Sequence, residues 1–182
     1  MIKLILFVVI STYILAISWK QLRKPSSHGF YRFFVFELLT ALFLINVDYW
    51  LEDPFGTFQL VSWSLLIISI YPVAAGYYLL LKIGKPSNAV VSKTDFTFEK
   101  TTNLITSGIF GYIRHPMYAS LLFLGWGIYF KHPDWLALFF EILITIFLYL
   151  TAIVEERENM KKFGDEYSAY MKRSKMFIPY LV

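Results

Sequence analysis

Long runs of apolar residues, bounded by charged residues or by Pro and Gly, dominate the pattern of this chain. A helix needs about 20 residues to cross ~30 Å of hydrocarbon. Five runs approach that length, at 2–19, 30–50, 58–81, 118–130 and 135–154. We expect a kink at Pro72 in the third run, and the fourth run is short for a full crossing. The pattern predicts a bundle of about five transmembrane helices.

The connectors between these runs indicate how the helices follow one another. Only the residues 131–134 separate the last two runs, which predicts a tight antiparallel hairpin. The first run also has the apolar character of a signal peptide, but no small-x-small cleavage site follows it, so we expect a retained helix. Because the chain contains no internal repeat and no low-complexity tract, we predict a single domain over 1–182, with a three-helix scaffold in 1–81.

Composition points to the same class of protein. The chain is 57% hydrophobic and 16% charged, against roughly 45–50% and 25% in an ordinary soluble domain. We therefore predict an all-α, polytopic integral membrane protein that lies in a lipid bilayer, and we exclude intrinsic disorder and a water-filled β-barrel. With no cysteine and only three histidines, the chain is not expected to hold a metal. The net charge of +4 resides in the connectors, so no nucleic-acid partner is expected.

Basic residues alternate between the connectors in the way that membrane topology requires. They cluster after the first run, where Arg32 begins the second, between the third and fourth runs, and in the C-terminal tail. The connector after the second run carries Glu52 and Asp53 and no basic residue. Since cytoplasmic loops retain Lys and Arg, we expect the N-terminus outside and the C-terminus in the cytoplasm. The membrane would be the cytoplasmic membrane or the endoplasmic reticulum.

Two polar segments do not resemble membrane spans. The connector 82–115 is longer than packing requires, and loops of that length are usually functional or disordered. The segment 157–182 continues the last helix and carries Phe163, Tyr167, Tyr170 and Met171 at helical spacing. This spacing predicts an amphipathic helix on the cytoplasmic face, and the alternative is a solvated tail.

Polar residues within the last run share one face of its helix. At 100° per residue, Glu141, Thr145, Glu155 and Glu156 point in a similar direction. The two adjacent glutamates form either a functional carboxylate pair or a pair of helix-end charges in the headgroup region. For Glu141, a hydrogen bond to a neighbouring helix in the protonated state is favoured over catalysis.

A second concentration of polar chemistry lies at 107–118. Arg114 and His115 precede Pro116, which suits the first position of a helix. A helix N-terminus beside these two donors is a receiver for an anion or a carboxylate. The alternatives are that Arg114 only extends to the headgroups and that His115 only caps the helix.

Taken together, the motifs occur in an order that resembles that of a known family of membrane proteins. Arg-His-Pro-Met-Tyr at 114–118 is followed by the hairpin, by Glu155 and Glu156, and by Phe-Gly-Asp-Glu-Tyr at 163–167. This half of the chain, from about residue 102, resembles the membrane isoprenylcysteine carboxyl methyltransferases and the related phospholipid methyltransferases. The first hundred residues match only in hydropathy.

The resemblance implies a methyltransferase that uses S-adenosyl-L-methionine and acts on a lipophilic small-molecule or lipidated substrate. The part 82–182 would then comprise a cofactor-binding loop, the helical hairpin and a C-terminal cap. By similarity, the residues that contact the cofactor are Leu104, Ile105, Phe110, Arg114, His115, Pro116, Met117, Tyr118 and Glu155. His115 and Glu156 are candidate proton acceptors if the acceptor is an amine.

Substrate contacts are expected from the polar face of the last helix, at Glu141 and Thr151. The family pattern departs at the second of these, because the prenylcysteine enzymes carry an arginine there that is assigned to the substrate carboxylate. A hydroxyl cannot supply a bidentate fork, which argues against prenylcysteine as the acceptor.

Two other functions are compatible with the sequence. Membrane reductases of sterol-like lipids that use NADPH share a similar Arg-His-Pro-x-Tyr stretch, although they normally have more spans and an Asn where this chain has Met117. A non-catalytic membrane scaffold would keep the fold and bind no cofactor.

Overall fold

The computed structural model describes residues 1–83 and 103–181. All regular structure in these two ranges is helical, which confirms the predicted all-α class. The elements are α1 (Ile2–Leu22), α2 (His28–Asn46), η1 (Val47–Tyr49), α3 (Thr57–Ile83), η3 (Gly108–Gly111), α4 (Pro116–Tyr129), α5 (Trp135–Phe163) and α6 (Asp165–Arg173). Much of the predicted connector 82–115 lies outside the described residues.

Four of the described helices are long and apolar enough to cross a membrane: α1, α2 with η1, α3 and α5. The fourth predicted run forms α4, which has 14 residues and is the shortest helix of the bundle, as the short run predicts. α3 continues through Pro72 as one helix of 27 residues. The protein is therefore a polytopic membrane protein, as the apolar runs predict.

Local signals in the sequence set the helix ends around the hairpin. Pro116 occupies the first turn of α4, where its missing N–H costs nothing. Asp134 caps α5, because its side chain accepts a hydrogen bond from the N–H of Ala137 at 2.7 Å. α5 ends at Gly164, whose φ of 55° turns the chain into α6.

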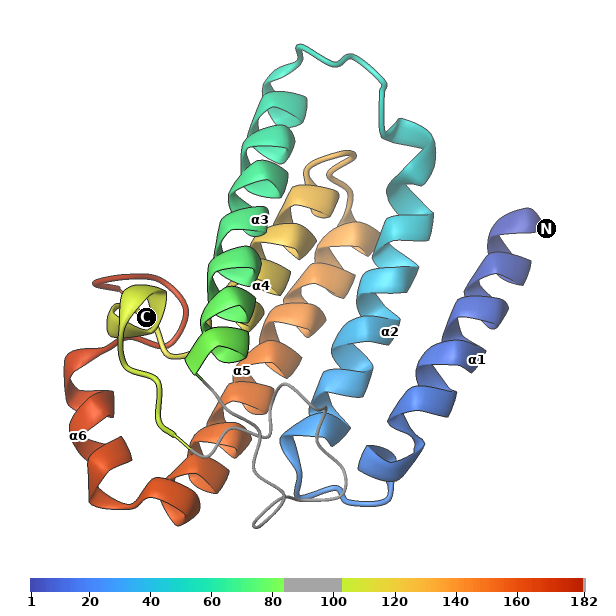
Figure 1. Cartoon of the computed structure of the whole chain (residues 1–182). Coiled ribbons are helices and arrows are strands. Elements are labelled where there is room, and N and C mark those ends of the chain that lie inside the picture. The colour runs from blue at the N-terminus through green and yellow to red at the C-terminus, as the bar shows by residue number, and fades with distance from the viewer. Residues whose placement is uncertain (84–102, 182) are drawn as a thin grey trace.

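The hairpin of α4 and α5 lies between the other long helices (Figure 1). α3 packs on α4 and α2 packs on α5, whereas α1 lies at the edge of the bundle beside α2. We call the end of the bundle where α2 and α4 begin and α3 ends the site end, and the opposite end, with η1 and the hairpin turn, the far end. α6 and the C-terminal residues fold back toward η3 at the site end (Figure 1).

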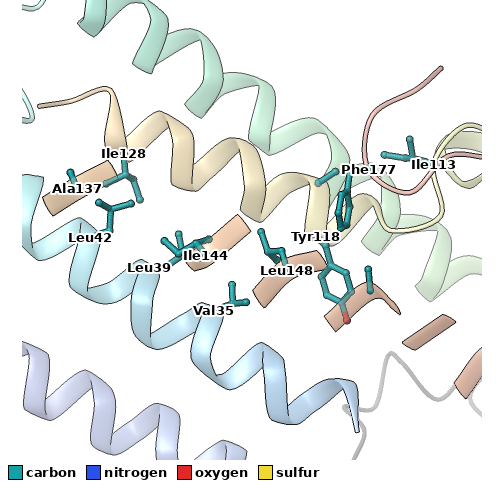
Figure 2. Close-up of a cluster of buried hydrophobic side chains, with 12 residues drawn as sticks. Val35, Leu39, Leu42, Ile113, Tyr118, Ile128, Ala137, Ile144, Leu148 and Phe177 are labelled. Atoms are coloured by element: carbon teal, nitrogen blue, oxygen red, sulfur yellow. The ribbon is translucent and has the colours of Figure 1, made fainter. Parts of the chain in front are cut away.

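Apolar side chains of α2 and α5 fill the centre of the bundle (Figure 2). Leu42 of α2 and Ile144 and Leu148 of α5 are fully buried. In a membrane, close packing and interhelical hydrogen bonds replace the hydrophobic driving force. Small residues provide that closeness, and a Cβ added to Gly127 of α4 would lie 2.8 Å from Leu66 Cδ2 of α3.

Buried polar side chains join neighbouring helices through backbone carbonyls. Ser62 of α3 donates to the carbonyl of Gly127 at 2.6 Å, and Ser120 of α4 donates to the carbonyl of Ser69 at 2.6 Å. Asn46 of α2 donates to the carbonyl of Ile128 at 2.8 Å. Such bonds are worth about 0.6–2 kcal/mol each between membrane helices, and they fix α2 and α3 to the hairpin.

A buried lysine closes the far end. Lys131, in the hairpin turn, donates to Gln59 Oε1 at 2.9 Å, and its ammonium lies 3.4 Å from the ring centroid of Trp63 and 4.9 Å from that of Trp50. Aromatic faces attract a cation through their quadrupole, most strongly where water is excluded. The hairpin turn is thereby tied to η1 and to the start of α3.

Candidate functional site

The residues after α6 hold the segment 112–115, which includes the start of the 114–118 motif, in place from outside the bundle. Ile113 and Lys175 form a parallel bridge. The N–H of Arg114 donates to the carbonyl of Lys175 at 2.7 Å, and the N–H of His115 donates to the carbonyl of Met176 at 3.1 Å. Because these backbone bonds fix both residues, the directions of their side chains are set before any ligand is bound.

The motif and the two glutamates of α5, some forty positions apart, meet at the site end. Arg114 Nε donates to Glu156 Oε1 at 2.7 Å. The ring of His115 lies between the carboxylates, with Nε2 at 3.4 Å from Glu156 Oε1 and Nδ1 at 3.7 Å from Glu155 Oε2. The structure thus brings the two clusters that carry the sequence resemblance into direct contact.

Most donors of Arg114 are engaged within the protein. Besides the bond to Glu156, its Nη1 donates to the carbonyl of Ser174 and, at 3.3 Å, to that of Met171. The side chains of Arg114 and Glu156 are only 9% and 10% exposed, so they form a buried ion pair. Arg114 therefore fastens the end of α6 to α5, in addition to facing the cavity described next.

A cavity of about 300 Å³ opens beside this pair, between the ends of α2, α3, α4, α5 and α6. Its wall includes every residue that the resemblance assigns to the cofactor. These residues are Leu104, Ile105, Phe110, Arg114, His115, Pro116, Met117, Tyr118 and Glu155.

Aromatic rings form one side of the cavity. Phe110 of η3, Tyr118 of α4 and Tyr167 and Tyr170 of α6 all line the cavity. Tyr170 donates its hydroxyl to the carbonyl of Phe110 at 2.6 Å. The ring of His115 stacks on Tyr118, with centroids 5.4 Å apart and planes at 10°. Burial raises the pKa of Tyr167 and of Tyr170, so both phenols stay neutral at physiological pH.

The beginning of α4 is also part of the wall. His115 is the N-cap residue of α4, yet its side chain makes no capping hydrogen bond and is directed toward the glutamates instead. Pro116 and Met117 follow on the wall. The positive end of the helix dipole and the first backbone N–H groups are therefore at the cavity, which favours a negatively charged group there.

Three of the expected site residues are not on the wall. Glu156 lies behind it, between Arg114 and His115. Glu141 is fully buried against Gly125, where a Cβ on the glycine would lie 2.4 Å from its carboxylate. Thr151 is fully buried and donates its hydroxyl to the carbonyl of Phe147 at 2.6 Å. Neither Glu141 nor Thr151 lies where a molecule in the cavity would touch it.

The cavity also contains residues that sequence reasoning missed. Asn159 and Lys162 follow Glu155 by four and seven positions on α5, a helical spacing that could have indicated a shared face. Arg32, interpreted above as a topological charge, lines the cavity from α2. The other such residues are Phe36, Val73, Leu80, Asn103, Ser120, Leu121, Phe163, Tyr167 and Tyr170.

Comparison with known proteins places this geometry in a family. The model of the phospholipid methyltransferase family matches residues 58–166, which is more than half of the chain and includes the motif and both glutamates. The chain belongs to the phospholipid methyltransferase family. The resemblance inferred from the two motifs is confirmed.

One similar member has a curated name. The chain is 27% identical to methanethiol S-methyltransferase 1 of Bradyrhizobium diazoefficiens over 175 residues, which cover 89% of this chain and 58% of that protein. The chain thus spans a little over half the length of this relative. No solved structure matches the chain.

Proposed function

We propose that this phospholipid methyltransferase family member transfers a methyl group from S-adenosyl-L-methionine to a lipophilic acceptor at the site end of the bundle. The observation that carries the proposal is the cavity, whose wall unites the 114–118 motif, Glu155 of α5 and the aromatic side chains of η3 and α6. The site end, which carries most of the basic connectors, would face the cytoplasm.

The residues present fit the charges of this cofactor. Its sulfonium and ammonium groups are cationic, and the cavity offers them the carboxylate of Glu155 and the faces of Phe110 and Tyr118. Its carboxylate is anionic and suits the beginning of α4 and Lys162. Its adenine is flat and suits the aromatic side formed with Tyr167.

When bound, the cofactor supplies an electrophilic methyl group, and the chain supplies mainly alignment. Displacement at a methyl carbon requires donor and acceptor to be held in line, which rigid helix ends provide. Glu156 and Glu155 fix the ring of His115 from two sides, and Arg114 fixes Glu156. His115 and Glu155 are the groups on the wall that can take a proton from an acceptor that must lose one.

The acceptor would occupy the apolar side of the cavity. Phe36 of α2, Val73 and Leu80 of α3 and Leu121 of α4 line this side, and Val73 is also exposed on the outer surface of the bundle. An acceptor with a hydrocarbon part could therefore lie partly in the bilayer. Prenylcysteine is not favoured, because Thr151 is buried and bonded to the backbone.

A second candidate function is methylation of a small thiol. The observation that favours it is the name of the relative, methanethiol S-methyltransferase 1. Both functions use the same donor, so they share one test of the site.

The test compares thermal unfolding of the detergent-solubilised protein with S-adenosylhomocysteine and with NADPH. A ligand at 100 times its Kd stabilises the native state by about 2.7 kcal/mol. We expect stabilisation by S-adenosylhomocysteine in the wild type and in the control His132→Ala, at the far end, and its loss in Glu155→Gln and His115→Ala. Stabilisation by NADPH alone would indicate a reductase, and stabilisation by neither would indicate a scaffold; both results reject the proposal.

A further inference from the structure

The chain after α6, which we call the C-terminal segment (174–181), ends in exposed apolar side chains. Tyr180 is 82% exposed and Leu181 is 71% exposed, whereas Phe177 of the same segment is buried. In a membrane protein, exposed aromatic and aliphatic side chains at the end of a bundle are typical of the boundary between hydrocarbon and headgroups. Tyr180 and Leu181 are therefore placed to contact lipid.

The C-terminal segment lies beside the end of a helix that is long and apolar enough to span a membrane. A Cβ on Gly108 of η3 would lie 2.7 Å from Leu79 Cδ1, so η3 packs on the last turns of α3. The segment is joined to the residue after η3, because the N–H of Lys175 donates to the carbonyl of Tyr112 at 2.9 Å. Figure 1 shows the C-terminal residues next to η3 and the end of α3. Because α3 is a candidate span, its last turns and the segment beside them would lie near the headgroups.

Two exposed lysines accompany these apolar side chains. Lys172 is in the last turn of α6, and Lys175 is in the C-terminal segment. Neither ammonium group forms an ion pair within the described part of the chain. The acidic residues of α6, Asp165 and Glu166, are at the other end of this helix, about 10 Å from Lys172 along its axis at 1.5 Å per residue. That distance is about one Debye length at 0.1 M salt, so these carboxylates compensate the lysines only weakly.

Helix electrostatics and membrane topology explain only part of this surface. Lys172 complements the negative end of the α6 dipole, and both lysines agree with the rule that basic residues stay on one side of a membrane. Neither reason requires exposed apolar side chains nearby. Lysines combined with exposed aromatic and aliphatic side chains suit the surface of an anionic membrane, because the former pair with phosphate and the latter enter the acyl boundary.

The C-terminal segment also holds residues of the cavity wall. Its carbonyl groups at Lys175 and Met176 accept hydrogen bonds from the N–H groups of Arg114 and His115, and the carbonyl of Ser174 accepts one from Arg114 Nη1. A lipid bound to this segment would therefore order the backbone that orients two side chains of the wall. A ligand in the cavity would then lose less conformational entropy on binding, which raises its affinity.

We propose that Lys172, Lys175 and the exposed end of the C-terminal segment bind an anionic membrane lipid, and that this binding raises the affinity of the cavity for its ligand. The lipid would place its phosphate at the two lysines and its acyl chains against Tyr180 and Leu181. The first part of the inference is independent of the proposed function. The second part rests on it, because the ligand used to measure the affinity is S-adenosylhomocysteine.

The first experiment measures which lipid lies beside the C-terminal segment. The full chain with Tyr180→Trp is placed in nanodiscs of equal parts phosphatidylglycerol, which is anionic, and phosphatidylcholine, which is zwitterionic. Bromine atoms on the acyl chains of one lipid or the other quench the emission that this substitution adds. The double variant Lys172→Gln with Lys175→Gln, made in the same background, removes the two charges.

The matched control is Lys20→Gln with Lys24→Gln. These two lysines are also exposed and lie at the end of α1, which is at the site end of the bundle, so the control loses the same charge on the same side of the membrane. Arg173 is left unchanged in both variants, because its guanidinium carbon lies 5.9 Å from the ring centroid of Tyr170 on the cavity wall.

We expect brominated phosphatidylglycerol to quench this emission more than brominated phosphatidylcholine does, both with the lysines intact and in the control. A basic side chain near an anionic surface contributes about fivefold to the binding, so the preference should fall by about 5- to 25-fold in Lys172→Gln with Lys175→Gln. At 1 M salt, where the Debye length is about 3 Å, the preference should largely disappear. The salt comparison requires no change of either lysine, so it decides the matter even if the double variant does not fold.

The second experiment measures the affinity for S-adenosylhomocysteine in discs of phosphatidylcholine alone and in the equal mixture. We expect the anionic lipid to raise this affinity by about fivefold or more in the wild type and in the control. In Lys172→Gln with Lys175→Gln the change should be less than about twofold. Inorganic phosphate added to phosphatidylcholine discs should not reproduce the increase, because it has no acyl chains that hold it at this surface.

Each part of the inference has results that would overturn it. Equal quenching by the two lipids, or a preference that persists in the double lysine variant, would reject the lipid-binding surface. An increase in affinity with inorganic phosphate alone would assign the lysines to a soluble anion and reject the lipid. A preference for phosphatidylglycerol with the same S-adenosylhomocysteine affinity in both discs would reject the link to the cavity. Failure of S-adenosylhomocysteine to bind in either disc would instead reject the proposed function, and the quenching would still decide whether the lipid is bound.

Discussion

Two ion pairs of similar length allow the role of burial in this protein to be measured directly. Arg114 Nε lies 2.7 Å from Glu156 Oε1, and Lys3 Nζ lies 2.6 Å from Asp48 Oδ2. The side chains of the first pair are 9% and 10% exposed, and those of the second pair are 42% and 67% exposed. The pairs differ mainly in how far they are removed from solvent.

This difference in burial predicts very different losses in the free energy of unfolding when the carboxylate of each pair is removed. Glu156→Ala leaves the buried guanidinium of Arg114 without its counter-charge, and such a loss costs about 3–5 kcal/mol. Asp48→Ala removes an exposed pair and should cost about 0–1 kcal/mol. For a chain of this length, about 2–4 °C of Tm accompanies each kcal/mol, so Glu156→Ala should lower the Tm by about 6–20 °C.

The assay is the free energy of unfolding in one detergent. It is measured for Glu156→Ala and Asp48→Ala, for Arg114→Met and Glu156→Leu singly, and for the double variant Arg114→Met with Glu156→Leu. Since the double variant removes both charges, it should recover a large part of the loss seen in Glu156→Ala. Equal costs for Glu156→Ala and Asp48→Ala would refute the argument. So would a double variant as unstable as the sum of the two single changes, because the two charges would then not depend on each other.

Three further predictions concern other parts of the bundle. Burial raises the pKa of Tyr170, so the folded state holds the phenol proton more tightly than the unfolded state does. The free energy of unfolding should therefore fall as the pH rises above about 10, where the phenol of the unfolded state loses its proton. Tyr170→Phe should reduce that fall in unfolding measurements from pH 8 to 11. In Gly76→Ala, the new Cβ would lie 2.9 Å from the ring of Pro116, so overpacking should cost about 1–3 kcal/mol and weaken S-adenosylhomocysteine binding in a thermal-shift titration. In Gly111→Ala, the new Cβ would lie 3.4 Å from the carbonyl oxygen of Thr106, which is an ordinary contact, so this variant should retain both stability and binding. Lys131→Met should lower the free energy of unfolding by about 1.5–3 kcal/mol without changing that binding, and a loss of binding would contradict the separation of the two ends.

The sequence predicted the helices well because a bilayer restricts what apolar runs can form. Backbone groups in hydrocarbon must be satisfied internally, so a run such as 58–81 becomes a helix even across Pro72. The part of the cavity wall that we propose for the cofactor could be assembled from the sequence, because its residues occur in two short motifs with specific chemistry. Charges of opposite sign at the ends of α4 and α5 could be expected to meet in a hairpin.

The helical periodicity of polar residues could not predict which groups the polar face of α5 contacts. Glu141 and Thr151 share the inward face of α5 with Glu156, but the first contacts Gly125 and the second bonds to its own helix backbone. The topology rule already accounts for a positive charge at the start of a span, so nothing in the sequence indicated that Arg32 lines the cavity. Pairing of Lys175 with Ile113 depends on the path of the chain after α6, for which the sequence carries no local signal.

The two sides of the cavity are built in different ways, and this difference bears on how the substrate could vary within one architecture. The side proposed for the cofactor is cross-linked by the Arg114 and Glu156 pair and by backbone bonds from Lys175, so a change in one residue disturbs several others. The side proposed for the acceptor is formed by apolar residues of α2, α3 and α4, such as Phe36 and Val73, which would contact a ligand through packing. The family match begins at residue 58 and therefore includes α3 but not α2. Within this arrangement, α2 is the element in which we expect a new acceptor to be accommodated while the proposed donor side is retained, and Phe36 is the wall residue of α2 at which a change of side-chain size should alter acceptor preference.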